Sequence, residues 1–141
     1  MQEQEVLKIH PVALAFVGDA AYSLYVREKL IRSGEDKPIV YQKAASAAVS
    51  ALGQNALLQK IEPIFTEEEA EIFRRARNSK KNSKAKNATA AEYNRSTGLE
   101  AVIGYLYLSK NYARLEEILS LTEISTAKTR EEMQKIKEFK P

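Results

Sequence analysis

Hydrophobic positions recur at helical spacing through most of this chain. Pro11 suits the first turn of a helix, and apolar side chains follow at intervals of three and four residues: Leu14, Val17, Ala21, Leu24 and Tyr25. The pattern predicts one long helix over about residues 12–32, ending near Gly34. Because this helix is apolar on nearly every side, we expect it in the centre of a helical bundle.

Three further helices are predicted downstream. Pro38 opens a helix over about residues 38–52, and a shorter one covers about 54–61. The next begins at a capping box, in which the hydroxyl of Thr66 and the carboxylate of Glu69 each satisfy a free amide group of the first turn. We expect this third helix to run to about Arg77.

Residues 78–94 break the helical pattern, because they are polar, aperiodic and basic. We expect an exposed loop there, and a loop this long inside a compact domain is usually functional or disordered. A strongly apolar helix is predicted from Leu99 to about Lys110, and an amphipathic one over about 112–121. The charged tail over about 126–140 is helix-prone, with a narrow apolar stripe.

The sequence contains no alternating strand pattern, glycine-rich phosphate loop or internal repeat. The expected fold class is therefore all-α, a helical bundle. A length of 141 residues is ordinary for a single domain, so we expect residues 1–141 to form one domain with a core over about residues 10–122.

Composition narrows the chemistry that this bundle can perform. The chain has no cysteine and a single histidine, His10, which excludes disulfides, thiolate zinc sites and thiol nucleophiles and disfavours histidine-based sites. Any hydrolytic chemistry must therefore rest mainly on carboxylates and a bound metal. The acidic N-terminus and the polar interruptions of the apolar run 12–26 argue against a signal peptide or a membrane span, so the expected location is cytoplasmic.

The net charge of +3 hides an uneven distribution. Between positions 74 and 95 there are eight basic residues and one acidic residue, whereas the remainder of the chain is net acidic. We predict that this basic segment contacts a polyanion, the alternative being a solvated loop that only aids solubility. The candidate contact residues are Arg74, Arg75, Arg77, Asn78, Lys80, Lys81, Lys84, Lys86 and Arg95.

Two acids in apolar helices are the most informative polar positions. Asp19 lies within the long predicted helix, and Glu100 lies at the start of a later one. Each has a glycine nearby, Gly18 and Gly104, whose missing side chain lets two backbones approach closely. A buried carboxylate must be protonated, paired with a cation or bound to a metal. Two acids on facing helices suit a hard cation such as Mg²⁺, and hence phosphodiester chemistry.

Each acid also has a purely structural interpretation. Thr97 and Glu100 have capping-box spacing, so Glu100 could simply close the start of its helix. Asp19 could pair with an arginine, such as Arg74 or Arg95. The pattern alone leaves these alternatives open.

Residues 14–20, Leu-Ala-Phe-Val-Gly-Asp-Ala, resemble the signature helix of the ribonuclease III family, usually written L-E-F-L-G-D-A. Residues 99–108 resemble the second motif of that family, in the same order along the chain. Segments 18–27, 65–69, 74–78 and 93–97 are similar to the short Mini-ribonuclease III subgroup, which consists of the catalytic domain alone. The resemblance covers about residues 10–120.

The resemblance implies catalytic and metal-binding roles for Asp19, which matches the signature aspartate, and for Glu100, which matches the glutamate of the second motif. Ala15 and Thr97 stand where the family has two further acids. This departure is shared with the short subgroup. It weakens the case for a four-carboxylate site and for a second tightly held metal.

The family resemblance implies a homodimeric, Mg²⁺-dependent endonuclease that cleaves both strands of duplex RNA and leaves 5′-phosphate ends. In the subgroup the substrate is the paired stalk of precursor 23S ribosomal RNA, and a ribosomal protein is a further candidate partner. The chain has no room for a separate double-stranded RNA-binding domain, so we expect the basic segment to contact RNA in a salt-dependent way. The main alternative is a non-catalytic all-α module that binds structured RNA, and a weaker one is a scaffold for protein partners.

Overall fold

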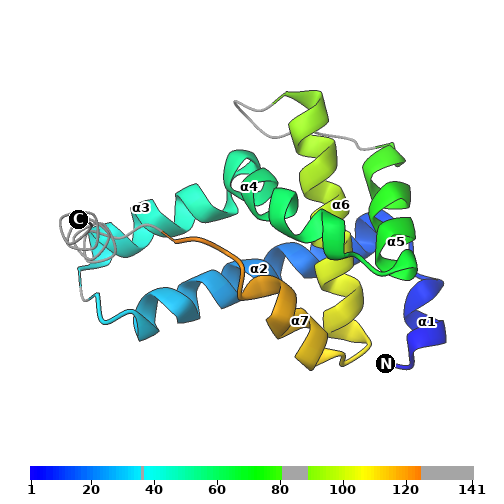
Figure 1. Cartoon of the computed structure of the whole chain (residues 1–141), viewed down its shortest axis with the longest axis horizontal. Helices are drawn as coiled ribbons and strands as arrows, with labels where there is room; N and C mark the ends of the chain where they lie inside the picture. Colours follow the sequence, from blue (N-terminus) through cyan, green and yellow to red (C-terminus); the bar gives the residue numbers. More distant parts are fainter. Residues whose placement is uncertain (36, 81–88, 125–141) are drawn as a thin grey trace, which may run out of the picture.

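The computed structural model describes residues 1–35, 37–80 and 89–124 (Figure 1). Every regular element within these ranges is helical, which confirms the expected all-α class. The predicted helix over 126–140 lies outside the described residues, as do Lys81, Lys84 and Lys86. In the described part of the chain, no helix combines the length and apolar character that crossing a membrane requires.

Two long helices, α2 (Pro11–Arg32) and α6 (Ala90–Leu108), cross at the centre of the molecule (Figure 1). Their backbones meet at glycines, as the sequence predicted. A Cβ atom on Gly18 would lie 1.7 Å from the carbonyl oxygen of Glu100, and one on Gly104 would lie 1.9 Å from the carbonyl oxygen of Leu14. Only glycine fits at these two positions, so the crossing holds Glu100 directly against α2.

Shorter helices surround this crossing, and their side chains fill the core around Tyr22, Leu58 and Ile103. The short N-terminal helix was not predicted, because it carries one buried apolar side chain and shows no periodicity. The elements are α1 (Glu3–Leu7), α3 (Pro38–Val49), α4 (Ala51–Ile61), the 3₁₀ helix η1 (Glu62–Ile64), α5 (Glu67–Asn78) and α7 (Tyr112–Leu119).

The corner between α3 and α4 lies slightly earlier than expected. The sequence predicted helices over 38–52 and 54–61, whereas the chain breaks at Ser50, whose backbone is extended. The Ser50 hydroxyl accepts a hydrogen bond from the amide of Gly53 at 3.1 Å and so caps α4. Capping at this serine moves the boundary.

The predicted capping box of α5 is present. The Thr66 hydroxyl accepts a hydrogen bond from the Glu69 amide at 3.1 Å, and the Glu69 carboxylate accepts one from the Thr66 amide at 3.0 Å. The buried Glu69 carboxylate also accepts hydrogen bonds from Arg114, which ties α5 to α7.

The start of α6 corrects the sequence interpretation. The helix begins after Thr89, whose hydroxyl accepts the Glu92 amide at 3.1 Å, and not at Leu99. Thr97 therefore lies inside the helix, where its hydroxyl donates to the carbonyl of Tyr93 at 3.0 Å. The capping-box interpretation of Glu100 is wrong. The first two turns of α6 were missed because they are polar and carry no apolar periodicity.

Candidate active site

Asp19 from α2 and Glu100 from α6 line one hollow at the helix crossing, with a volume of about 810 Å³. The Asp19 residue is exposed, which differs from the buried setting expected from its apolar helix, and Glu100 is half-buried. His10, Gln54 and Lys80 line the same hollow. The two predicted acids therefore share one solvent-accessible site.

The two carboxylates interact with each other. Burial raises the pKa of Glu100, and the hydrogen bond and the negative charge of Asp19 act in the same direction, to give a value of about 8. The carboxamide of Gln54 opposes this shift by hydrogen bonding to Glu100. Near neutral pH, the metal-free pair therefore holds a proton that a divalent cation can displace.

The donor atoms around the pair suit a hard cation. Asp19 and Glu100 supply carboxylate oxygens, and the buried Oε1 atom of Gln54 has no hydrogen-bond partner among the described residues. Within this described part, no group of three or more acidic, histidine or cysteine side chains is placed to hold a metal. A site with two carboxylates fits a cation such as Mg²⁺ that keeps several of its waters.

The arginine alternative for Asp19 is not supported. Arg74 pairs with Glu71 at 2.6 Å, and Arg95 pairs with Glu62 at 2.8 Å. Within the ranges that the structure describes, Asp19 forms no ion pair with either arginine. The charged group that interacts with Asp19 is Glu100, and among the described residues neither acid forms an ion pair with a lysine or arginine.

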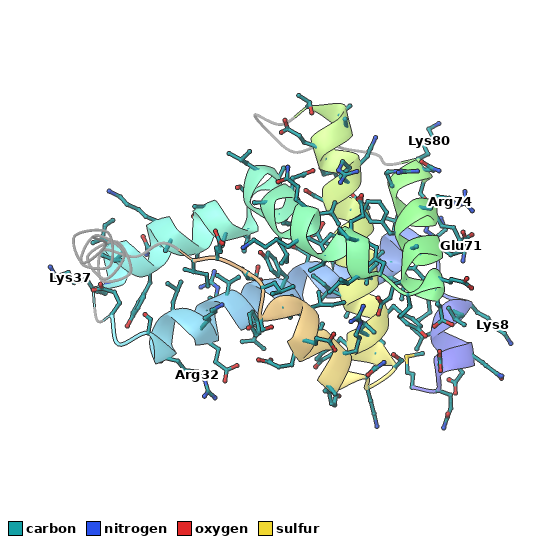
Figure 2. The ribbon with its side chains drawn as sticks, in the orientation of Figure 1. Lys8, Arg32, Lys37, Glu71, Arg74 and Lys80 are labelled. Atoms are coloured by element: carbon teal, nitrogen blue, oxygen red, sulfur yellow. The ribbon has the colours of Figure 1, made fainter. Side chains whose placement is uncertain are left out.

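Of the predicted basic residues, those that the structure describes lie on α5, just beyond it and on α6. Figure 2 shows Arg74 and Lys80 projecting outward on the α5 side of the molecule, with Glu71 beside Arg74. Arg75 and Asn78 are exposed on α5. Of the described basic residues in this set, Lys80 lines the hollow that holds the two carboxylates.

Arg77 and Arg95 also have contacts within the protein. Both guanidinium groups lie over the ring of Phe73, at 5.6 Å and 5.7 Å from its centroid. Arg95 additionally donates a hydrogen bond to Asn55 at 3.2 Å. By contrast, Arg75 and Lys80 form no ion pair within the described part of the chain, which leaves their charge available to a ligand.

Two residues of the hollow were not singled out from the sequence. Gln54 shares the apolar face of α4 with Leu57 and Ile61, and a lone glutamine on such a face was a signal that could have been read. His10 caps α2, since its Nδ1 atom accepts a hydrogen bond from the Val12 amide at 3.1 Å. Its position in the lining of the hollow results from the crossing of α2 and α6, and no sequence pattern around His10 indicates it.

Comparisons with known proteins agree with the motifs. The ribonuclease III domain model matches residues 12–111. The Mini-ribonuclease 3 of Streptococcus pneumoniae is 45% identical over 118 residues, covering 82% of this chain and 92% of the relative. The Mini-ribonuclease 3 of Brevibacillus brevis is 44% identical over 123 residues, covering 84% of this chain and 92% of the relative.

The fold is shared with a solved structure as well. The crystal structure of a Fusobacterium nucleatum protein superposes with a TM-score of 0.73 at 32% identity, covering 81% of this chain and 91% of the other. The helical crossing, the motif acids that meet there and the curated relatives all lead to one assignment. The chain is a double-strand-specific endoribonuclease that belongs to the ribonuclease III family.

Proposed function

We propose that the chain cleaves duplex RNA in a Mg²⁺-dependent reaction, with Asp19 and Glu100 as the catalytic, metal-binding acids, and leaves 5′-phosphate ends. The observation that carries this proposal is the shared hollow, in which the two acids interact and, in the part of the chain that the structure describes, neither is paired with a lysine or arginine. When bound, Mg²⁺ would polarise a phosphoryl oxygen and lower the pKa of a water nucleophile.

The residues of the chain have distinct tasks in this reaction. Asp19 is exposed and offers its oxygens directly to an incoming cation. Glu100 would hold the cation together with Asp19, and its proton would pass to solvent when the cation binds. Gly18 and Gly104 keep the two carboxylates close, since any larger side chain would separate α2 from α6.

The basic segment supplies the RNA contacts in this proposal. Lys80 would hold a phosphate next to the cleavage site, and its position in the lining of the hollow supports this role. A-form RNA is contacted through phosphates and 2′-hydroxyls, which suits long cationic side chains. The proposed contact residues are those predicted from the sequence: Arg74, Arg75, Arg77, Asn78, Lys80, Lys81, Lys84, Lys86 and Arg95. The proposed substrate is the paired stalk of precursor 23S ribosomal RNA in the cytoplasm.

We also propose that the chain acts as a homodimer. Phe16, Leu24 and Ile31 recur along α2 at spacings of eight and seven residues and are 81%, 66% and 62% exposed. A row of exposed apolar side chains on one helix is typical of an interface. Phe16 also lines the catalytic hollow, so a second copy would complete its wall. A two-fold axis would then present two identical sites to the two antiparallel strands.

Conservative substitutions of the acids test the catalytic assignment. Asp19→Asn and Glu100→Gln are expected to lower kcat for duplex cleavage by about 10³-fold or more, while RNA affinity changes little, because shape is kept and metal-ligating charge is lost. Cleavage is measured on a labelled duplex and RNA affinity by filter binding. Either variant retaining the parent turnover would refute the role of that acid.

Salt dependence tests the RNA contacts. Lys80→Ala combined with Arg75→Ala is expected to weaken duplex binding and to reduce the slope of log K against log salt by about 2, one unit for each lost phosphate contact. Lys8→Ala combined with Lys37→Ala removes two exposed cations outside the basic segment and serves as the control, which should keep the parent slope. An unchanged slope in the double variant would mean that these side chains are only solvated.

A further inference from the structure

Gln54 of α4 is a buried polar side chain beside the carboxylate pair. It is 4% exposed and lines the same hollow as Asp19 and Glu100. Along α4 it shares its buried face with Leu57 and Ile61, where a hydrophobic residue would be the ordinary choice. A buried carboxamide at such a position requires hydrogen-bond partners.

The two ends of this carboxamide are satisfied unequally. The Nε2 atom of Gln54 donates a hydrogen bond to the carbonyl of Val49 at 3.0 Å. The Oε1 atom has no hydrogen-bond partner among the described residues. Because the Nε2 end of the carboxamide is bound to Val49, Oε1 is the end that lacks a partner among these residues. An unpaired buried acceptor is costly, so its retention beside the acids calls for a ligand.

The two positions at which the family resemblance implies further acids supply no carboxylate here. Ala15 has no polar side-chain atom, and the Thr97 hydroxyl donates its proton to the carbonyl of Tyr93, which leaves it a neutral acceptor only. A cation held by two carboxylates retains more of its waters than one held by four. Those waters are hydrogen-bond donors that need oxygen acceptors in the protein.

We propose that Gln54 is a positioning residue of the metal site: its Oε1 accepts a hydrogen bond from a water of the hydrated Mg²⁺ held by Asp19 and Glu100. This inference rests on the proposed function, because it requires the carboxylate pair to bind the cation. The hydrogen bond to Val49 fixes the orientation of the carboxamide before the cation arrives. Gln54 thereby supplies one of the oxygen acceptors that carboxylates at positions 15 and 97 would otherwise provide.

Two substitutions separate the oxygen of Gln54 from its amide group. Gln54→Met removes both at nearly constant length, whereas Gln54→Glu keeps an oxygen and removes the amide donor. Mg²⁺ is titrated alone into RNA-free protein, and its Kd is measured by calorimetry and by the Mg²⁺-induced rise in melting temperature. The expected result is a Kd about tenfold weaker in Gln54→Met and at least as tight as the parent in Gln54→Glu.

Asn55 provides a matched control on the same helix. Its carboxamide is paired at both ends, since Nδ2 donates to the carbonyl of Ala51 at 2.8 Å and Oδ1 accepts from Arg95 at 3.2 Å. Asn55→Leu is expected to lower the melting temperature without changing the Kd for Mg²⁺. If Gln54→Met behaves in the same way, Gln54 is only structural and the inference is overturned.

Glu100→Gln separates failure of this inference from failure of the proposed function. If Glu100→Gln loses Mg²⁺ binding while both Gln54 variants bind like the parent, the inference is wrong and the carboxylate site stands. If Glu100→Gln also binds Mg²⁺ like the parent, both are refuted. Should Gln54→Met fail to fold, Gln54→Glu decides alone, because weaker binding than the parent would overturn the inference.

Discussion

Glu100 keeps a proton at a pH where most glutamates have lost theirs. Its pKa lies near 8, well above the ordinary value of 4.5, because the side chain is buried beside Asp19. The folded state therefore binds a proton more tightly than the unfolded state over this interval. By linkage, the metal-free protein loses stability as the pH rises from about 4.5 to about 8 and loses no more from this group above that.

Glu100→Gln should remove this pH dependence. Without metal, the free energy of unfolding of the variant is expected to depend less on pH. Above about pH 8 it should exceed that of the parent by roughly 2 kcal/mol, because solvent in the open hollow screens part of the charge penalty. Urea denaturation in the presence of a chelator, between about pH 5 and pH 9, measures the difference. Glu5→Gln, at an exposed position of α1, should follow the parent. Parallel profiles for Glu100→Gln and the parent would contradict the raised pKa.

At the scale of elements, α5 and α7 are joined by a buried ion pair. Arg114 donates hydrogen bonds to both carboxylate oxygens of Glu69, at 3.0 Å and 2.8 Å, and to the carbonyl of Ile64. The Glu69 side chain is 3% exposed, and its carboxylate also caps the start of α5. Although burial alone would raise the pKa of Glu69, hydrogen bonds from Arg114 and Thr66 hold it below its ordinary range.

Arg114→Leu should therefore destabilise the fold by about 3–5 kcal/mol, because it leaves a buried carboxylate without its cationic partner. Arg74→Leu is the matched control, since it breaks an exposed pair with Glu71 and should change the stability far less. Both are measured by urea denaturation near neutral pH. Equal losses for the two variants would show that the buried pair has no special weight.

Local sequence patterns predicted some helix boundaries and missed others. The span of α2 followed from its apolar spacing, and the α5 capping box followed from two side chains. The start of α6 did not follow, because its first turns are polar and its N-cap, Thr89, comes directly after a polar, aperiodic stretch. The motifs singled out Asp19 and Glu100. The position of Gln54 on an apolar helix face was visible in the sequence, whereas its unpaired buried oxygen is visible only in the packed structure.

At the scale of the whole molecule, two sets of exposed side chains are relevant to the proposed reaction. One set is basic and lies on α5 and just beyond it, and the other is the apolar row of Phe16, Leu24 and Ile31 on α2. The catalytic hollow touches both sets, through Lys80 and Phe16. One surface is thus suited to RNA and the other to a second copy, and the two carboxylates lie between them.

The proposed dimer can be tested by placing charge in the exposed apolar row of Phe16, Leu24 and Ile31 on α2. Leu24→Glu combined with Ile31→Glu should weaken self-association by about 10²-fold or more, because each change buries a carboxylate in an apolar interface. Sedimentation equilibrium measures the association, and circular dichroism confirms that the helices persist. Tyr112→Glu places the same charge at an exposed aromatic of α7, outside this row, and should leave association unchanged.

The same variants test whether cleavage of both strands depends on the proposed dimer. Since two symmetric sites are needed to cut both strands in one encounter, a monomeric variant with an intact hollow should produce mainly single-strand nicks in a duplex, at a reduced rate. Products separated on native and denaturing gels distinguish nicks from double-strand breaks. A parent that sediments as a monomer would show that the exposed row on α2 has some other partner. A monomeric variant that still makes double-strand breaks at the parent rate would show that cleavage of both strands does not need the dimer.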